Sequence, residues 1–272
     1  MKVALTGANG FVASHLKKSF KDYVVIERND SEDEILKKLE NVDAVFNLAG
    51  APIIKRWSKS YKKILLSSRV DTTRNIVNAI NQSNVKHFIS TSAIGAYPDD
   101  DSFDESYTEY GDDFLGYLTK EWEDEAKKCT KPTTIVRFGV ILGKDGGALA
   151  QMFLPFKLGV GGTIGNGKMM TSWIDIDDLV SIYEYIIENK ITGTINATAP
   201  NPVTNYTFTK ALGAQLHRPT LFPLPEFVLK LIFGEGATVL TGSKEVYPKR
   251  LLESGFEFQY KDIDSSLAHL LS

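Results

Sequence analysis

Short runs of β-branched and aromatic residues alternate with stretches of helical periodicity through the first half of the chain. Strands are predicted over residues 2–6, 23–27, 44–48, 87–91 and 133–138. Apolar residues recur at helical spacing over 11–20, 33–40, about 58–82 and 114–128. Pairs such as Val45-Phe46 and Ile135-Val136 lack polar alternation, which is typical of strands covered on both faces. This alternation predicts an α/β fold with a Rossmann-type, doubly wound parallel sheet.

The second half changes character after Gly147. Residues 158–168 are too rich in glycine for regular structure, and 200–205 are typical of a turn into a helix. Residues 172–187 are predicted to return to the sheet as a helix, and 194–198 as a strand. We therefore expect a Rossmann domain formed by 1–145 and 171–199, with a smaller C-terminal substrate lobe formed by 146–170 and 200–272.

Composition and charge exclude several classes of protein. The 272 residues carry 31 Lys and Arg against 34 Asp and Glu. The chain therefore lacks the excess of basic residues that is typical of nucleic-acid-binding proteins. The single cysteine, Cys129, forms no intramolecular disulfide, and the four histidines lie far apart without metal-ligand spacing, so no metal is expected. No apolar run approaches the roughly 18 residues of a membrane span, and the N-terminus lacks a signal peptide. We expect a cytoplasmic protein that binds a small molecule, with no membrane partner.

The strongest chemical signal is a glycine turn between the first predicted strand and the first predicted helix. Gly7 permits a tight turn, Gly10 lets the backbone approach a pyrophosphate, and Ala13 allows the helix to pack closely on the strand. The helix N-terminus adds amide donors and a partial positive charge. A purely structural turn is the alternative, but this position favours dinucleotide binding.

The end of the second strand bears on which dinucleotide binds. An acidic residue there would bond the ribose 2′-hydroxyl, whereas an arginine would accept a 2′-phosphate. Both types are present, as Glu27 and Arg28. Because guanidinium pairs well with phosphate, Arg28 favours NADP over NAD. The alternative is that Arg28 is only a solvated strand end.

A series of longer motifs identifies a family. In chain order they are TGANGFVASHL (6–16), NLAGAPI (47–53), SRVDTTRNIVNAI (68–80), STSAIGAY (90–97), WEDEA (122–126), VRFGVILGKDGGAL (136–149), LPFKLGVGGTIGNGK (154–168), SWIDIDDL (172–179) and PKRLLESGFEF (248–258). This order resembles, over nearly the whole chain, the atypical extended short-chain dehydrogenase/reductases classed as NAD(P)-dependent epimerase-family proteins. The resemblance implies a Rossmann lobe, a smaller C-terminal lobe and a cofactor often reported as NADP, with a poorly defined substrate.

The resemblance also assigns cofactor contacts to positions of this chain. It implies a phosphate loop, an arginine after the second strand, a loop beside the riboses, a serine-arginine motif and a strand end near the nicotinamide. The matching residues are Gly7, Gly10, Phe11, Val12, Arg28, Leu48, Ala49, Arg69 and Val140. Dimerisation through the outer helices is common in this superfamily, so the resemblance is compatible with a homodimer.

Reductases of this superfamily use a Ser or Thr, a Tyr, and a Lys four residues after the Tyr. The Tyr acts as acid or base once a neighbouring ammonium lowers its pKa. The matching candidates are Ser92 and Tyr117, but position 121 is Glu121 and the nearest ammonium is Lys120, about 100° away on the helix. We predict Ser92, Tyr117 and Lys120 as the catalytic set; the alternative is that Tyr117 and Lys120 are ordinary helix residues. Tyr97 is a second candidate acid or base.

Two functions follow from these observations. The first is an NADP-dependent oxidoreductase or epimerase that acts on a polar carbonyl or carbinol metabolite such as a nucleotide-sugar. The second is an NADPH-binding regulatory or interaction protein without turnover, which the missing lysine keeps open. The glycine-rich segment 158–168 is interpreted as a flap over the substrate, with Lys168 facing an anionic group, and Asn201 and Asn205 as substrate-facing residues.

Overall fold

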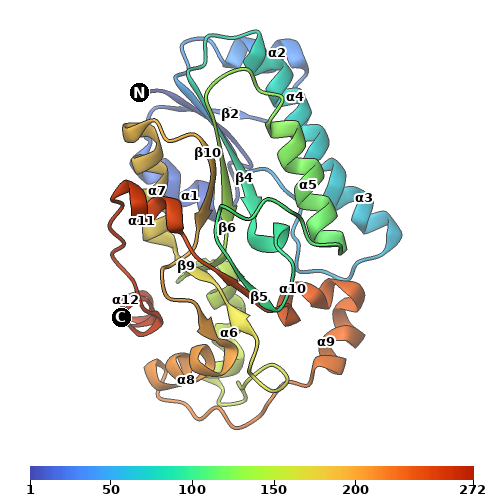
Figure 1. Cartoon of the computed structure of the whole chain (residues 1–272), viewed down its shortest axis with the longest axis vertical. Coiled ribbons are helices and arrows are strands. Elements are labelled where there is room, and N and C mark those ends of the chain that lie inside the picture. Colours follow the sequence, from blue (N-terminus) through green and yellow to red (C-terminus); the bar gives the residue numbers. More distant parts are fainter.

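A six-stranded parallel sheet forms the centre of the computed structural model, which describes residues 1–272 (Figure 1). Its strands, in the order β10-β6-β4-β3-β1-β2, are all parallel. They are β1 (Val3–Thr6), β2 (Tyr23–Ile26), β3 (Ala44–Asn47), β4 (His87–Ala93), β6 (Thr133–Phe138) and β10 (Gly193–Ala197). The predicted strands are confirmed to within one or two residues at their ends.

Helices cover both faces of this sheet, so the predicted doubly wound fold is confirmed. One face carries α1 (Phe11–Ser19) and α7 (Ile176–Asn189), which pack together. The other carries α2 (Glu32–Lys38), α4 (Val70–Asn81) and α5 (Phe114–Ala126), with α3 (Lys59–Ser67) beside α4 and α5. The stretch expected as one helix over 58–82 is two helices, because Ser68 and Arg69 turn the chain and bind the main chain of Ala51.

The strands are apolar on both faces, as their sequences predict. Val3, Leu5 and Phe46 point into a large cluster with α1 and α7, whereas Ala4 and Val45 point into a second cluster with α2 and α4. Side chains alternate between the faces of a strand, so adjacent residues enter different cores.

Further elements build the C-terminal lobe and its connections to the sheet. These are η1 (Ile94–Ala96), β5 (Asp101–Phe103), β7 (Val140–Gly143), α6 (Gly147–Lys157), β8 (Met170–Thr171), β9 (Trp173–Asp175), β11 (Val203–Thr204), α8 (Asn205–Gln215), α9 (Glu226–Phe233), η2 (Gly234–Ala237), α10 (Thr238–Thr241), β12 (Lys244–Val246), α11 (Lys249–Ser254) and α12 (Ile263–Leu271). None of the helices is long and apolar enough to cross a membrane.

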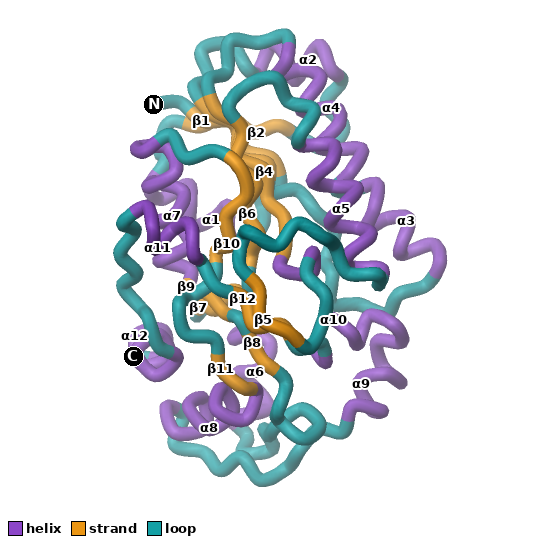
Figure 2. The backbone as a smooth tube through the Cα atoms, in the orientation of Figure 1, coloured by secondary structure: helices purple, strands orange, loops and turns teal.

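The C-terminal segment does not stay within a separate lobe. Strand β12 pairs with β5, as the tube in Figure 2 shows. Leu251 of α11 and Leu267 of α12 are buried in the same apolar cluster as Val3 of β1. The lobe boundaries stay a prediction, but the last helices pack on the Rossmann core.

One sequence-based expectation needs correction at the start of α7. Residues 172–187 were expected as a single helix, yet Trp173–Asp175 form β9, which pairs with β7. The helix begins at Ile176 because Asp175 accepts a hydrogen bond from the amide of Asp177 at 2.9 Å and caps it.

A buried asparagine fastens three neighbouring strands to α4. The Asn47 side chain donates to Thr73 Oγ1 at 2.7 Å and accepts from Thr6 Oγ1 at 2.8 Å, and it lies 3.4 Å from Ser90 Oγ. Asn47 and Thr73 are fully buried, so water cannot replace these bonds.

We expect Asn47→Ala to lower the free energy of unfolding by about 1–3 kcal/mol, because it leaves buried hydroxyls without partners. Urea denaturation measures this loss. Asn78→Ala, on the exposed side of α4, is the matched control and should leave stability nearly unchanged. Equal midpoints for the two variants would contradict the assignment.

Candidate functional site

The sheet reverses its direction of winding between β1 and β3. From β1 the chain passes to β2 on one side, and then to β3 on the other side of β1. Ligands of open parallel sheets bind beyond the carboxyl ends of the strands at such a reversal. Residues Gly7–Gly10 follow β1 and Leu48–Ala49 follow β3, so both predicted loops lie at this point.

The Gly7–Gly10 turn has the geometry of a phosphate-binding loop. Gly7 has a φ of +62°, and a Cβ there would lie 2.9 Å from the carbonyl oxygen of Leu48. Gly10 is the N-cap of α1 and provides no side-chain cap, and its amide donates to the Gly7 carbonyl at 2.8 Å. The first-turn amides of α1, including those of Phe11 and Val12, therefore have no partner within the helix and can bind an anion.

Phe11 links this turn to the loop that follows β7. A Cβ built on Gly143 or Gly146 would lie 2.3 or 2.2 Å from its ring. Only glycine fits at these two positions while the ring stays in place. Val140 begins β7, and its amide donates to the carbonyl of Ser172 at 2.8 Å. The ring of Phe11 thus connects the phosphate loop to the strand end predicted to lie near the nicotinamide.

Arg28 is exposed and makes no hydrogen bond or ion pair. The β1–β2 register pairs Thr6 with Ile26, so Arg28 lies as far beyond its strand as Ala8 lies beyond β1. The guanidinium is therefore free at the end of the sheet that carries the phosphate loop. Lys17 adds a second cation there, because its ammonium donates to the carbonyl of Ala8.

The loop after β3 is held by two side chains. Thr6 Oγ1 accepts hydrogen bonds from the amides of Leu48 at 3.0 Å and Ala49 at 3.1 Å. Arg69 donates to the Ala51 carbonyl at 3.0 Å, and its guanidinium lies 5.3 Å from the centre of the Trp122 ring. Burial lowers the pKa of Arg69 to about 10. Arg69 thus shapes this loop and has no carboxylate partner.

A buried ion pair lies behind Ser92. Arg137 of β6 donates to both carboxylate oxygens of Glu123 on α5, at 2.8 and 2.9 Å. Ser92 donates its hydroxyl proton to the same carboxylate at 2.6 Å. Burial raises the pKa of Glu123, but the hydrogen bonds and charge of Arg137 outweigh it and hold that pKa below its ordinary range. The one hydroxyl proton of Ser92 is therefore already donated to the Glu123 carboxylate.

Two tyrosines complete this network. Tyr110 donates to Glu123 at 2.7 Å and accepts from Lys127 at 3.0 Å. Burial and the Glu123 carboxylate raise the pKa of Tyr110. Tyr97 lies under the Arg137 guanidinium, is fully buried, and has its hydroxyl 3.0 Å from Asn196 Oδ1. This placement removes Tyr97 as a candidate acid or base, because its hydroxyl faces the interior.

The structure does not bring Tyr117 and Lys120 to Ser92. Helix α5 buries Leu118 and Glu123 against the sheet, while Tyr117 is 50% exposed. Lys120 pairs with Asp124 at 2.7 Å on the exposed side of the same helix. Their spacing on the helix places both side chains away from the sheet. The catalytic role of this set stays a prediction without a supporting contact.

The residues that sequence reasoning missed are Thr6, Asn47, Glu123 and Arg137. Arg137 carried a usable signal, since a charged residue inside a strand covered on both faces requires a buried partner. That partner, Glu123, lies in a helix with several acidic residues, and only the tertiary structure distinguishes it from them.

The other side-chain assignments are resolved in part. Asn205 is buried and accepts from the Ile164 amide at 2.8 Å, so it holds the glycine-rich segment instead of facing a substrate. Asn201 donates to the Lys261 carbonyl at 3.0 Å. Lys168 is exposed on that segment. Residues 162–168 have the spacing G-x-x-x-x-G-K of a phosphate-binding P-loop, but strand β8 follows them where a P-loop requires a helix.

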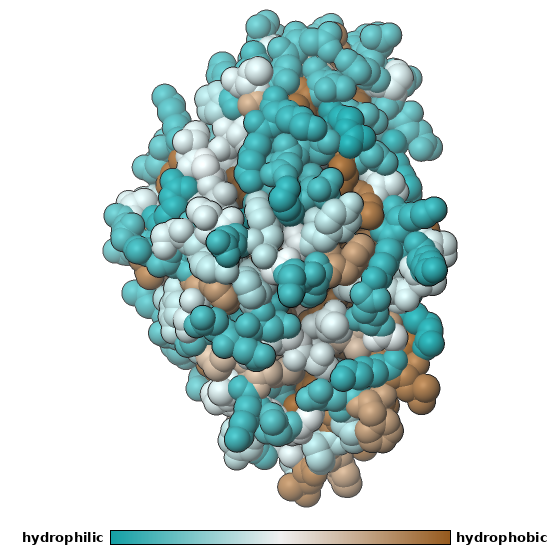
Figure 3. Space-filling model, turned by 45° about the vertical axis from the view of Figure 1, so that its right-hand side comes forward, coloured by the Kyte–Doolittle hydropathy of each residue, from teal (hydrophilic) through white to brown (hydrophobic).

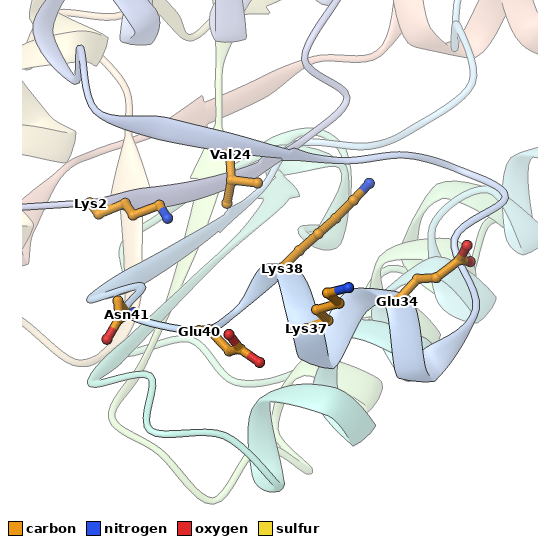
Figure 4. A pocket seen from close by; sticks show the side chains of 7 residues that line it. All are labelled: Lys2, Val24, Glu34, Lys37, Lys38, Glu40 and Asn41. Carbon is orange, nitrogen blue, oxygen red and sulfur yellow. The ribbon is translucent and has the colours of Figure 1, made fainter.

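A depression at the opposite end of the sheet does not belong to this site. It is lined by Lys2, Val24, Glu34, Lys37, Lys38, Glu40 and Asn41 (Figure 4). Lys2 precedes β1 and Asn41 precedes β3, so the depression lies at the amino ends of the strands. Val24 is its one hydrophobic lining residue, whereas cofactor pockets are lined mainly by apolar and aromatic side chains.

Comparisons with known proteins find relatives that match this chain over its whole length. The family model described as "NAD dependent epimerase/dehydratase family" matches residues 3–198, and a domain of unknown function (DUF1731) matches residues 224–270. The Arabidopsis thaliana "Epimerase family protein SDR39U1 homolog, chloroplastic" is 37% identical, with 100% of this chain and 87% of that protein covered. Epimerase family protein YfhF of Bacillus subtilis is 34% identical over 100% of this chain and 98% of its own length.

Solved structures show the same fold. The crystal structure of human epimerase family protein SDR39U1 with NADPH has a TM-score of 0.92 at 32% identity, covering 100% of this chain and 99% of that one. A UDP-glucuronic acid 4-epimerase from Bacillus cereus, in complex with UDP-glucuronic acid and NAD, has a TM-score of 0.80 at 16% identity, covering 100% of this chain and 98% of that one. At that identity the second likeness concerns the fold alone.

We expect Glu123→Gln to destabilise the protein by about 3 kcal/mol, because it leaves the Arg137 cation buried without a countercharge. Adding Arg137→Met should restore much of this loss. Glu121→Gln, on the same helix but without an ion pair, is the control. Thermal melts and urea denaturation measure all three, and a Glu123→Gln variant as stable as the control would refute the interpretation.

The stability of the protein in acid should depend on the same carboxylate, that of Glu123. The pKa of Glu123 is lower in the folded than in the unfolded chain, so its stabilisation is complete above about pH 4.3. It is lost as the pH falls through the lowered folded value. Between about pH 5 and 3 the wild type should therefore lose more stability than Glu123→Gln. Parallel stability curves for the two proteins would contradict this.

Proposed function

Because the chain belongs to the NAD dependent epimerase/dehydratase family, we propose that it is an NADP-dependent oxidoreductase or epimerase of the extended short-chain type. Its substrate is a polar carbonyl or carbinol metabolite, of which a nucleotide-sugar is one class. The observation that carries this proposal is the uncapped Gly7–Gly10 turn at the sheet reversal, with a free Arg28 beside it. The human relative that contains NADPH supports the same cofactor.

Each predicted cofactor residue has a role in this proposal. The Gly7 and Gly10 turn and the first-turn amides of α1, at Phe11 and Val12, bind the pyrophosphate. Arg28 binds the 2′-phosphate as a bidentate donor. The bound nicotinamide supplies hydride transfer to or from the substrate carbon.

The loops after β3 and β6 bind the rest of the cofactor. Leu48 and Ala49, held by Thr6, present the β3 loop to the riboses, and Arg69 fixes its far side. Val140, the first residue of β7, borders the nicotinamide just beyond the end of β6. Lys168, exposed on the glycine-rich segment, provides a cation for an anionic group of the substrate.

The second candidate function is an NADPH-binding regulatory or interaction protein without turnover. It is favoured by the Ser92 hydroxyl, which donates to Glu123 and so cannot at the same time donate to a substrate oxygen. It is also favoured by the exposed positions of Tyr117 and Lys120. Tight NADPH binding without oxidation of NADPH by any member of a carbonyl panel would select this candidate.

Arg28→Ala should weaken NADPH binding by about tenfold or more and leave NADH binding nearly unchanged, because only NADPH carries the 2′-phosphate. Fluorescence titration with both cofactors measures the two dissociation constants. Lys21→Ala removes a cation from the loop between α1 and β2, at the other end of the sheet, and should change neither. Equal affinities for the two cofactors, unaffected by Arg28→Ala, would sink the NADP assignment.

Tyr117→Phe tests the predicted catalytic set. If Tyr117 is the acid or base, turnover should fall by orders of magnitude while NADPH affinity is retained. Lys120→Met should then lower turnover as well, and its effect should depend on pH. Unchanged turnover in Tyr117→Phe, on any substrate that the wild type reduces, would remove Tyr117 from the mechanism.

A further inference from the structure

Helix α9 is apolar on nearly every side but is largely exposed. Six of its eight residues are apolar, and of these only Leu229 is buried. Phe227 is 70% exposed, Leu231 72% and Ile232 53%. A helix that is hydrophobic all round is normally enclosed by protein or lipid. This helix therefore lacks a covering surface in the isolated chain.

The loop before α9 extends the apolar surface. Leu221 is 70% exposed and Phe222 59%. We call the five side chains Leu221, Phe222, Phe227, Leu231 and Ile232 the apolar end of the molecule. Together they expose roughly 600 Å², at the upper limit of what monomeric proteins show. Figure 3 shows this hydrophobic surface at the lower end of the molecule, where the C-terminal lobe lies.

A basic segment lies against the same helix. Residues 55–63 contain five Lys and Arg and no Asp or Glu, in a chain whose net charge is −3. Arg56 donates to the carbonyl of Leu231 at 2.5 Å, and the amide of Trp57 donates to the carbonyl of Phe233 at 3.2 Å. These bonds attach the basic segment directly to the C-terminal half of α9.

Most of these cations have no carboxylate partner. Lys62 pairs with Glu235 at 2.5 Å, but the other four cations of the segment form no ion pair. They are Lys55, Arg56, Lys59 and Lys63, all of them exposed. Lys230 adds a further cation on α9 itself, and Glu226 is the acidic residue of that helix. The surroundings of the apolar end are therefore strongly positive.

We propose that the apolar end and the basic segment together dock this protein on an anionic lipid surface, contrary to the expectation from sequence that it has no membrane partner. Exposed aromatic and aliphatic side chains beside a cluster of lysines and arginines are what binds the interface of a bilayer with acidic headgroups. Insertion of Phe227 and Leu231 between the headgroups removes apolar area from water, and the basic segment neutralises headgroup charge. Neither step depends on the proposed cofactor.

A second copy of the chain fits this surface less well. A symmetric dimer through the apolar end would bring two basic segments toward each other, and like charges oppose such an interface. A peptide-binding groove is also a poor description, because Figure 1 places α9 at the outer edge of the molecule. Charge complementarity therefore favours the lipid surface.

Sedimentation with vesicles tests the proposal. The protein should bind vesicles of phosphatidylcholine with phosphatidylserine but not vesicles of phosphatidylcholine alone, and high salt should weaken the binding. Phe227→Glu with Leu231→Glu should abolish it. Lys59→Gln with Lys63→Gln should weaken it about fivefold for each lysine neutralised. Leu252→Glu, which changes an apolar residue of α11 that is 47% exposed, is the control and should bind normally.

Three results would overturn the proposal. The first is no binding to the acidic vesicles, and the second is equal binding to neutral and acidic ones. The third is a dimer in sedimentation equilibrium that Phe227→Glu with Leu231→Glu dissociates, which would assign the apolar end to a second copy. Thermal melting of every variant distinguishes loss of the lipid-binding surface from unfolding of the protein. Because the replaced side chains are exposed, the melting temperature should stay nearly unchanged.

Discussion

The close approach of two main-chain segments between β1 and β3 is the constraint on which the site depends. The carbonyl of Leu48 lies where any side chain at position 7 would be, and position 7 itself needs a positive φ. Only glycine meets both conditions without strain. The turn after β1 is therefore tight, and α1 starts directly beyond the strand. The first amides of α1 have no side-chain hydrogen-bond partner. The Thr6 hydroxyl, which accepts from the amides of Leu48 and Ala49, fixes the same approach from the strand side.

On the face of the sheet covered by α4 and α5, the strands change from apolar to polar toward their carboxyl ends. Ala4, Val45 and Phe88 are followed two residues later by Thr6, Asn47 and Ser90. The same change places Arg137 at the end of β6, where it faces the Glu123 carboxylate. A buried ion pair of this kind adds little net stability but fixes the register of the helix on the sheet, because any shift would leave a charge without its partner. Together with the buried Leu118 and Trp122, the ion pair holds one face of α5 inward and leaves Tyr117 and Lys120 on the other face.

The fold and the cofactor loop could be predicted from sequence because both depend on local signals. Strand runs, helical spacing and the glycines of the first turn each lie within a few residues. The catalytic geometry depends on side chains far apart in the chain. The partner of Ser92 is 31 residues away, and the contact between Glu123 and Arg137 joins residues on different elements of the fold. The break at Ser68 and Arg69 was missed for the same reason, since both bind the distant Ala51 main chain.

The pairing of β5 with β12 bears on how the protein forms during synthesis. Residues 101–103 take as their neighbour a strand at 244–246, near the end of the chain. While the ribosome is still adding the second half, the acidic loop around β5 has no strand to pair with. Strands β1, β2, β3, β4 and β6 contain only residues already made, so they can pair with one another before β12 is synthesised. The apolar cluster of Tyr97 and Phe103 is completed last, because Val246 of β12 packs within it. The helices after β12 close the core in the same step, since Leu251 and Leu267 are buried in one cluster with Val3 of β1.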